Sequence, residues 1–382
     1  MRAADAVQVI EQAMVTPLET WGDYSPKAIP SCIYDKDEYF FLNHPDPPTE
    51  RPPQLTAATA CEIGGAMTAI IPADMCPDEQ ALVPLFYHEC FHAYQNNRFH
   101  FAERFDFFKC LAYYPEFDPH YRAWCAAEAE VLSNPALPAR RKAVDMAALA
   151  RKRHSLMRGR EGLLAFEGSS ERREGTASYV EQKAAAVLFG RSHETVTPCY
   201  GWSRQYTFGA AVCHLLDKTL GSDWQARVEQ GATPTQVLCD AFGQEKADLS
   251  HLRLEEKLAA ERENVERQRA EVMAEVEGLE RHGVTRIRLP KGATISRSFS
   301  PIRITSLGDG RLVHHDFVLL QLPNGTISVR GDLAIEDHED GCLYVRRFPI
   351  HVQDGKLTYQ SETLSLSLAE VEQTAEGEIT IG

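Results

Sequence analysis

The sequence predicts an α+β protein in which a mainly helical region is followed by a long charged helix and a small antiparallel β region. Three observations support this fold class. Apolar residues recur at helical spacing within residues 78–248, charged residues dominate residues 249–283, and short alternating strands separated by turn residues fill residues 284–382. A chain of 382 residues, 43% of them hydrophobic, is long enough for roughly two or three domains.

Residues 1–77 are expected to form an N-terminal mixed α/β part. Short apolar runs such as SCIYDKDEYFFL and GGAMTAIIPADM are separated by the proline-rich stretch NHPDPPTERPPQL. This pattern predicts a few strands and loops.

Residues 78–248 are expected to form a helical domain. In PDEQALVPLFYHECFHAYQNN, Asp78 is a candidate N-cap, and apolar residues follow at helical spacing. Pro84 either begins this helix or bends it. Further helices are predicted from the stretches DPHYRAWCAAEAEVLSN, PARRKAVDMAALARKRHSLM, SSERREGTASYVEQKAAAVLFG and TFGAAVCHLLDKTLG.

Residues 249–283 are expected to form a long connecting helix that ends at Gly283. Leu258, Val265, Val272 and Leu279 repeat every seven residues, but the companion positions of the heptad are mostly charged. That pattern makes a poor coiled-coil seam. We therefore expect the helix to lie on a neighbouring domain in preference to pairing with a second copy.

Residues 284–382 are expected to form a small antiparallel β domain. The strands VTRIRL, FVLLQL, TISVR, CLYVRRFPIHV and KLTYQ are separated by the hairpin signals Asp309-Gly310, Asn324-Gly325 and Asp354-Gly355. The pair His314-His315 in this region is interpreted as a surface pair.

Charge and cysteine content restrict the partners and the compartment. A formal net charge of -15 argues against nucleic acid or an anionic membrane as the main partner. No stretch approaches the about 18 consecutive apolar residues of a membrane span, and the N-terminus has no signal peptide pattern. Ten cysteines are scattered singly, without a C-x-x-C pair, so a reduced, cytoplasmic protein is expected.

The stretch HECFH, residues 88–92, is the strongest indication of chemistry in the chain. On a helix, His88 and His92 project from one face and can reach a single metal ion. Glu89 lies beside them and can take a proton from water activated by that metal. The motif therefore predicts a zinc site with its own general base.

The third ligand must come from elsewhere in the chain. A site resembling that of the metzincin metallopeptidases would have a glycine at position 95 and a third histidine at position 98, but the sequence has Gln95 and Arg98 there, and His100 has the wrong phase. A glutamate from a second helix is the remaining common solution, and Glu174 fits it.

The sequence around Glu174, EGTASYVE, adds details to this hypothesis. Gly175 and Ala177 are small enough to let two helices pack closely around the metal, and Ser178 could hydrogen-bond a ligand histidine. Three other glutamates remain alternative ligands: Glu167, Glu171 and Glu181.

Together the two motifs resemble the gluzincin group of zinc metallopeptidases, in which H-E-x-x-H is completed by a downstream glutamate. The resemblance covers about residues 60–220. It implies that His88, His92 and Glu174 hold Zn²⁺ and that Glu89 is the general base for hydrolysis of a peptide or protein substrate.

The resemblance also implies that the strand GGAMTAIIP is an edge strand that runs along the rim of the cleft and pairs with the substrate backbone. Gly64 and Gly65 would let a substrate chain come close. Thr68 and Ala69 stand where one aminopeptidase family of this group has Glu and Asn, so aminopeptidase activity is not expected.

An oxyanion donor usually assists the metal in such sites. By resemblance to the tyrosine that follows the glutamate helix in several gluzincins, Tyr206 is the favoured donor. Tyr200 and Tyr179 remain alternatives.

Two other functions compete with the peptidase hypothesis. The chain could be a catalytically inactive, zincin-like protein that binds a partner through the charged helix and the β domain. Alternatively, the zinc could be structural, although structural sites favour four Cys or His ligands.

Overall fold

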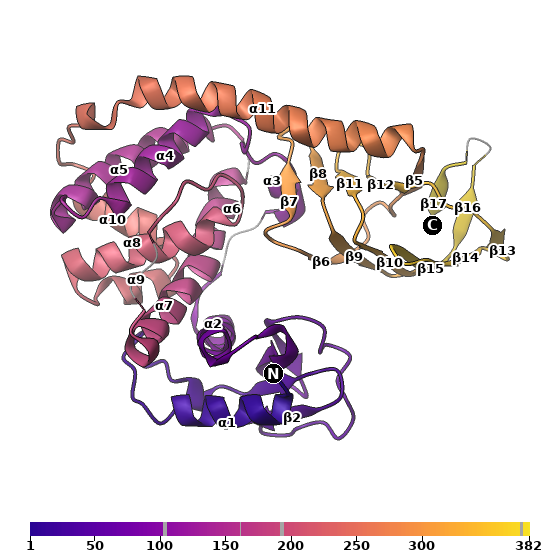
Figure 1. The fold of residues 1–382 in the computed structure, drawn as a ribbon, viewed down its shortest axis with the longest axis horizontal. Helices are drawn as coiled ribbons and strands as arrows, with labels where there is room; N and C mark the ends of the chain where they lie inside the picture. Colours follow the sequence, from indigo (N-terminus) through magenta and orange to yellow (C-terminus); the bar gives the residue numbers. More distant parts are fainter. Residues whose placement is uncertain (102–104, 161, 192–194, 375–376) are drawn as a thin grey trace.

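The computed structural model describes residues 1–382 except 102–104, 161, 192–194 and 375–376. Figure 1 shows an α+β arrangement: a small N-terminal sheet, a group of helices, and two C-terminal sheets joined to the helices by one long helix. The predicted fold class is confirmed at this level.

The N-terminal part combines one helix with a four-stranded sheet. Helix α1 (Ala3–Ala13) precedes β1 (Ser31–Tyr34), β2 (Tyr39–Leu42), β3 (Thr59–Ile63) and β4 (Ala66–Pro72). A mixed α/β part was expected here, but no stretch of it was assigned to a helix. The buried face of α1 consists of Ala3, Ala6 and Ile10.

The strand order is β2-β1-β4-β3, with β1 and β4 parallel and the other pairs antiparallel. Gly64 and Gly65, both at positive φ, make the turn between β3 and β4. The expectation that the GGAMTAIIP strand is an edge is therefore wrong. β4 is hydrogen-bonded on both sides, and β3 is the outer strand next to it.

The helical part follows a short 3₁₀ turn. Its helices are α2 (Glu79–Arg98), α3 (Phe107–Ala112), α4 (Pro119–Ser133), α5 (Ala139–Leu156), α6 (Leu163–Ser170), α7 (Thr176–Phe189), α8 (Arg204–Leu220), α9 (Trp224–Glu229) and α10 (Pro234–Phe242). The predicted N-cap is confirmed, because the Asp78 side chain accepts a hydrogen bond from the backbone N–H of Ala81 at 2.9 Å. Pro84 lies inside α2 and does not begin it.

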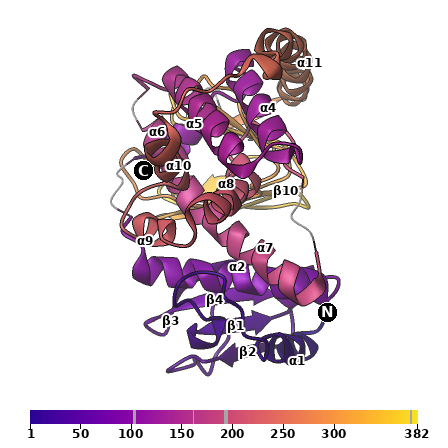
Figure 2. The ribbon, with the colours of Figure 1, turned by 90° about the vertical axis from the view of Figure 1, so that its left-hand side faces the viewer.

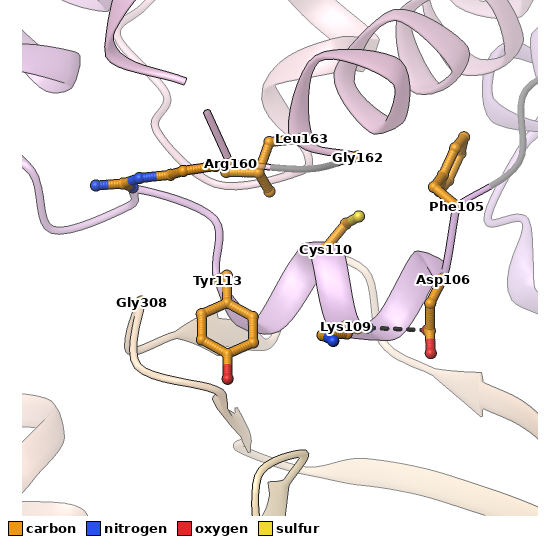
Figure 3. Close-up of a pocket in the computed structure, with 9 residues that line it drawn as sticks. All are labelled: Phe105, Asp106, Lys109, Cys110, Tyr113, Arg160, Gly162, Leu163 and Gly308. Atoms are coloured by element: carbon orange, nitrogen blue, oxygen red, sulfur yellow. Dashed lines mark hydrogen bonds between the residues drawn. The ribbon is translucent and has the colours of Figure 1, made fainter. Parts of the chain in front are cut away.

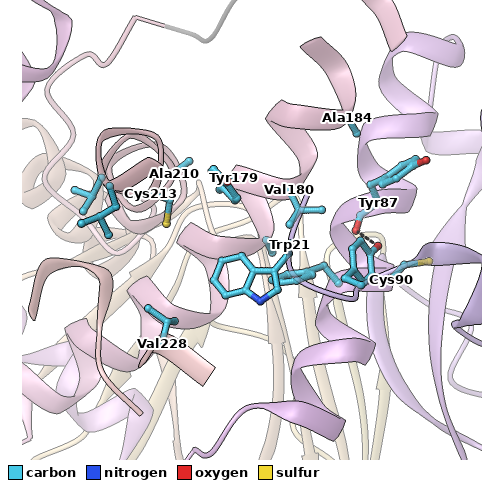
Figure 4. Packing of buried hydrophobic residues seen from close by; sticks show 14 of the residues in the cluster. Trp21, Tyr87, Cys90, Tyr179, Val180, Ala184, Ala210, Cys213 and Val228 are labelled. Carbon is cyan, nitrogen blue, oxygen red and sulfur yellow. Dashed lines mark hydrogen bonds between the residues drawn. The ribbon is translucent and has the colours of Figure 1, made fainter. Parts of the chain in front are cut away.

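One hydrophobic core joins the N-terminal sheet to α2, α7 and α8 (Figure 2). The Trp21 ring lies at its centre, with ring centroids 5.2 Å from Phe91 and 5.1 Å from Trp224 (Figure 4). Phe91 lies within the HECFH motif, so this packing holds the middle of α2 firmly in place.

A π-helical turn, Glu171–Gly175, connects α6 to α7 without a break. Gly175 crosses α8 at Gly209 so closely that a Cβ on Gly175 would lie 2.6 Å from the Cα of Gly209. Gly175 therefore allows close packing against α8, whereas sequence analysis had expected it to serve the packing around the metal.

Helix α11 (Leu254–Arg281) runs along the helices and then along the C-terminal sheets (Figure 1). Val265, Val276 and Leu279 are buried on its inner face, which packs on α4 and on the adjacent β-sheet. The prediction of a long helix lying on its neighbours is confirmed. Gly283, at φ +85°, follows the helix end as expected.

The C-terminal part contains two sheets. The first has the order β13-β14-β15-β10-β9-β6, and the second has the order β16-β17-β5-β12-β11-β8-β7. Their strands are β5 (Val284–Arg288), β6 (Ser296–Phe299), β7 (Ile304–Ser306), β8 (Arg311–His314), β9 (Phe317–Leu322), β10 (Gly325–Arg330), β11 (Ala334–Asp337), β12 (Cys342–Arg346), β13 (Val352–Gln353), β14 (Lys356–Gln360), β15 (Leu364–Ala369), β16 (Val371–Gln373) and β17 (Ile379–Ile381).

These sheets depart from the sequence prediction in two respects. The pairing is antiparallel except between β17 and β5, which are parallel. His314 is buried and faces Glu336, while Nδ1 of His315 donates to the carboxylate of Glu275 and its Nε2 forms a hydrogen bond with the hydroxyl of Thr305. The two histidines are therefore not a surface pair, because successive residues of a strand point to opposite faces.

Within the described residues, every helix is too short or too polar to cross a lipid bilayer. All ten cysteines are described, and each is a free thiol.

Candidate metal centre

His88 and His92 on α2 and Glu174 in the π-helical turn converge in the interior of the helical part. The Nε2 atoms of His88 and His92 lie 3.7 and 3.3 Å from Oε2 of Glu174. The three residues are at most 8% exposed. One potential ligand atom from each residue lies within 4.8 Å of the other two, so this group could hold a metal ion.

Gln95 fixes the protonation of His92. Its amide nitrogen donates to the carbonyl oxygens of Arg172 and Arg173, at 3.1 and 2.9 Å, so its amide oxygen must face the imidazole. That oxygen lies 2.8 Å from Nδ1 of His92. Nδ1 therefore carries the proton, and the lone pair of Nε2 points towards Glu174.

Glu181 on α7 orients the His88 imidazole in the same way. Its carboxylate Oε2 lies 2.9 Å from Nδ1 of His88 and accepts a hydrogen bond from it. When both imidazoles are neutral, their Nε2 lone pairs and the Glu174 carboxylate face one another in a buried space, and these acceptors repel one another unless a proton or a metal cation lies between them. Burial opposes protonation of His88, but its hydrogen bonds to Glu174 and Glu181 raise its pKa well above the ordinary value, so a cation is favoured at this point.

The spacing of these groups fits a divalent transition-metal ion, and zinc is one example. Zinc binds imidazole nitrogen and carboxylate oxygen at about 2.0–2.2 Å, so tetrahedral ligand atoms lie about 3.4 Å apart. The distances of 3.3 and 3.7 Å are close to this value. The hydrogen bonds from Gln95 and Glu181 are of the kind that orients metal-ligating histidines.

Replacing Gln95 with leucine should lower zinc affinity by about 10–100-fold, because His92 would lose the acceptor that fixes its tautomer. Competition with a chromogenic chelator measures this affinity. Gln95→Glu keeps an acceptor and should retain more of it. Equal zinc affinity in the parent and in Gln95→Leu would show that Gln95 does not orient the ligand.

Glu89 is 5% exposed, and its Oε2 has no hydrogen-bond partner among the described residues. Burial raises the pKa of Glu89, although His92 and His88 oppose this effect. A buried carboxylate oxygen without a partner is rare and calls for an explanation. It can accept a proton from a molecule that enters the site.

Tyr206, on α8, lies against the metal centre. Its ring stacks on that of His88 with a centroid distance of 6.1 Å and an interplanar angle of 10°. Burial, the nearby charge of Glu174 and a hydrogen bond to Glu174 raise the pKa of Tyr206 well above its ordinary value. Its hydroxyl is therefore a neutral donor beside the three ligands.

The other two candidate tyrosines lie elsewhere. Tyr200 donates to Glu261 at 2.8 Å and stacks under the guanidinium of Arg122. Tyr179 donates to Asp217 at 2.5 Å and is buried in the core beside Trp21 (Figure 4). Of the three tyrosines, only Tyr206 reaches the centre.

The alternative glutamate ligands are engaged in other contacts. Glu171 accepts hydrogen bonds from the backbone N–H and hydroxyl of Thr235, at 3.1 and 2.6 Å. Glu167 pairs with Arg153 and accepts a hydrogen bond from Tyr114 at 2.8 Å. Burial opposes its ionisation, but Arg153 holds the pKa of Glu167 below its usual range.

The structure also changes the expected roles of the small residues after Glu174. Ser178 is buried, and the hydrogen bonds to Nδ1 of His88 and His92 come from Glu181 and Gln95 instead. Ala177 lies in the shared hydrophobic core. Sequence analysis assigned no role to Gln95 beyond excluding a glycine there. Its position three residues after His92 on the same helix is the pattern that could have indicated a contact.

A separate cavity of about 670 Å³ lies between α3, the segment around Gly162 and the turn at Gly308 (Figure 3). Its lining residues are Phe105, Asp106, Lys109, Cys110, Tyr113, Arg160, Gly162, Leu163 and Gly308. None of the candidate ligands is among them, so this cavity is not part of the metal centre.

No protein-family model, curated protein or solved structure matches this chain.

Proposed function

We propose that this chain is a zinc-dependent hydrolase of peptide bonds, with His88, His92 and Glu174 as the zinc ligands. The observation that carries the proposal is the convergence of two oriented imidazoles and one carboxylate beside Glu89, whose Oε2 has no hydrogen-bond partner among the described residues. Three protein ligands leave a fourth position free, as catalytic zinc sites do. Structural zinc sites usually use four protein ligands instead.

When bound, zinc would supply Lewis-acid polarisation of the substrate carbonyl and would lower the pKa of a water molecule. Glu89 accepts the proton of the attacking water at its free Oε2. It then donates this proton to the leaving amine. The raised pKa of Glu89 brings the carboxyl group closer to the range in which it can both accept and release a proton.

Tyr206 donates its hydroxyl proton in a hydrogen bond to the oxygen on which negative charge develops. Its high pKa keeps this hydroxyl protonated. Stacking against His88 holds the ring beside the ligands.

The test is hydrolysis of a fluorogenic peptide library by the zinc-loaded protein. Cleavage should stop after removal of zinc with 1,10-phenanthroline and return when zinc is added. Stoichiometric zinc binding without cleavage of any peptide would instead favour the inactive, partner-binding alternative.

A further inference from the structure

Arg173, the residue directly before Glu174, extends along α2 beside the metal centre. Its Nη2 donates to Oδ1 of Asn96 at 3.1 Å. Asn96 follows His92 by four residues, so it lies on the same face of α2, about 6 Å further along the axis. The Asn96 amide in turn contacts the sulfur of Met67, at the start of β4, at 3.4 Å.

The contacts of this guanidinium are with neutral groups. Besides the Asn96 amide, it lies over the ring of Phe101, 5.0 Å from the ring centroid. No carboxylate among the described residues forms an ion pair with Arg173. By contrast, the buried side chains of Arg153 and Arg204 contact Glu128.

A half-buried guanidinium that has no acidic partner among the described residues keeps N–H donors available for a ligand. Burial removes part of its hydration, and its planar fork of five N–H donors matches a carboxylate in two-point contact. Among the residues that the structure describes, one of these donors has a protein acceptor. The remaining donors can bind an anionic group.

The surroundings limit where such an anion can bind. Glu89, Glu174 and Glu181 line the centre, and the whole chain carries a formal charge of -15. These charges repel an anionic substrate group at most positions. Arg173 supplies a local positive charge about one helical turn from His92.

We propose that Arg173 binds a carboxylate of the substrate, either an acidic side chain near the scissile bond or the free C-terminal carboxylate. This assignment rests on the proposed hydrolase function and gives it a substrate class. Arg173 would act as a specificity-determining residue, with Asn96 and Phe101 holding its side chain in place.

The zinc-loaded full-length protein would be tested with peptide pairs that differ only in charge. One set replaces Asp or Glu with Asn or Gln at successive positions, and another replaces the C-terminal acid with its amide. The parent should prefer the carboxylate member of one set by about 10–100-fold in kcat/KM. The set that shows the preference identifies the source of the carboxylate.

The Arg173→Gln variant should lose this preference while still cleaving the neutral peptides. Arg173→Lys keeps the positive charge but lacks the planar pair of N–H donors, so it should retain part of the preference for the carboxylate peptide. Arg191→Gln is the matched control, because Arg191 is exposed and also donates to a neutral amide, that of Gln80 at 3.2 Å. This control should behave as the parent does.

A binding measurement separates this proposal from the proposed function. Calorimetry would compare succinic monohydroxamate, which carries a carboxylate, with its carboxamide analogue. Tighter binding of the carboxylate form that disappears in Arg173→Gln supports the role of Arg173 even if no peptide is cleaved. Equal binding of both probes, or a preference that survives in Arg173→Gln, would overturn it.

Discussion

Replacing Glu89 with glutamine is expected to reduce kcat/KM for peptide hydrolysis by about 10³-fold while zinc remains bound. The amide has nearly the same shape as the carboxylate but cannot accept a proton, and general-base catalysis contributes about 10²–10⁴-fold in rate. Glu89 is not one of the three converging ligands, so the zinc content should stay close to that of the parent.

Two measurements decide this prediction: steady-state hydrolysis and the zinc content of the same preparation. The parent rate should also rise with pH through the pKa of Glu89, since only the ionised carboxylate accepts a proton. Burial raises the pKa of Glu89 and shifts this rise to higher pH, whereas the charge of bound zinc shifts it in the opposite direction. Undiminished turnover in Glu89→Gln would exclude Glu89 as the base.

Replacing Glu174 with alanine is expected to remove zinc from the purified protein. The parent should contain about one zinc per chain, because it offers three oriented ligands, and the variant would keep only the two histidines. The loss of affinity should exceed the about 10–100-fold that follows from removing a residue that only orients a ligand. Metal analysis of dialysed protein measures the zinc content.

Glu171→Gln is the matched control for this measurement. Glu171 lies three residues before Glu174 and is also buried, but it contacts Thr235 in place of the histidines. This variant should keep its zinc. If zinc were lost from Glu171→Gln and retained in Glu174→Ala, the ligand assignment would be wrong.

The sequence predicted the parts of the fold that follow from periodicity and turn chemistry. The long charged helix has its apolar residues on one face, and that face is the one buried in α11. His88 and His92 could be placed on one face of a helix because four residues make about one turn. Glu174 was favoured by its local motif, and the structure places it opposite both histidines.

Other features depend on contacts between distant segments and could not be predicted from local pattern. Glu181 contacts His88 because α2 and α7 pack side by side. β4 is internal because β1, more than thirty residues earlier in the chain, pairs with it. Gly175 faces Gly209 because α7 crosses α8 at that point. None of these pairings has a signature within a single stretch of sequence.

The π-helical turn at Glu171–Gly175 determines which carboxylate reaches the centre. In a regular α-helix, Glu167, Glu171 and Glu174 would follow one another along a single stripe, since residues three and four apart share a face. The wider turn carries about one extra residue, so Glu174 is rotated away from that stripe towards α2. Glu167 forms an ion pair with Arg153, and Glu171 accepts a hydrogen bond from Thr235. The number of residues in this turn therefore sets the helical register that brings Glu174 into the site. Homologous chains should tolerate substitutions in the turn far more readily than insertions or deletions of one residue.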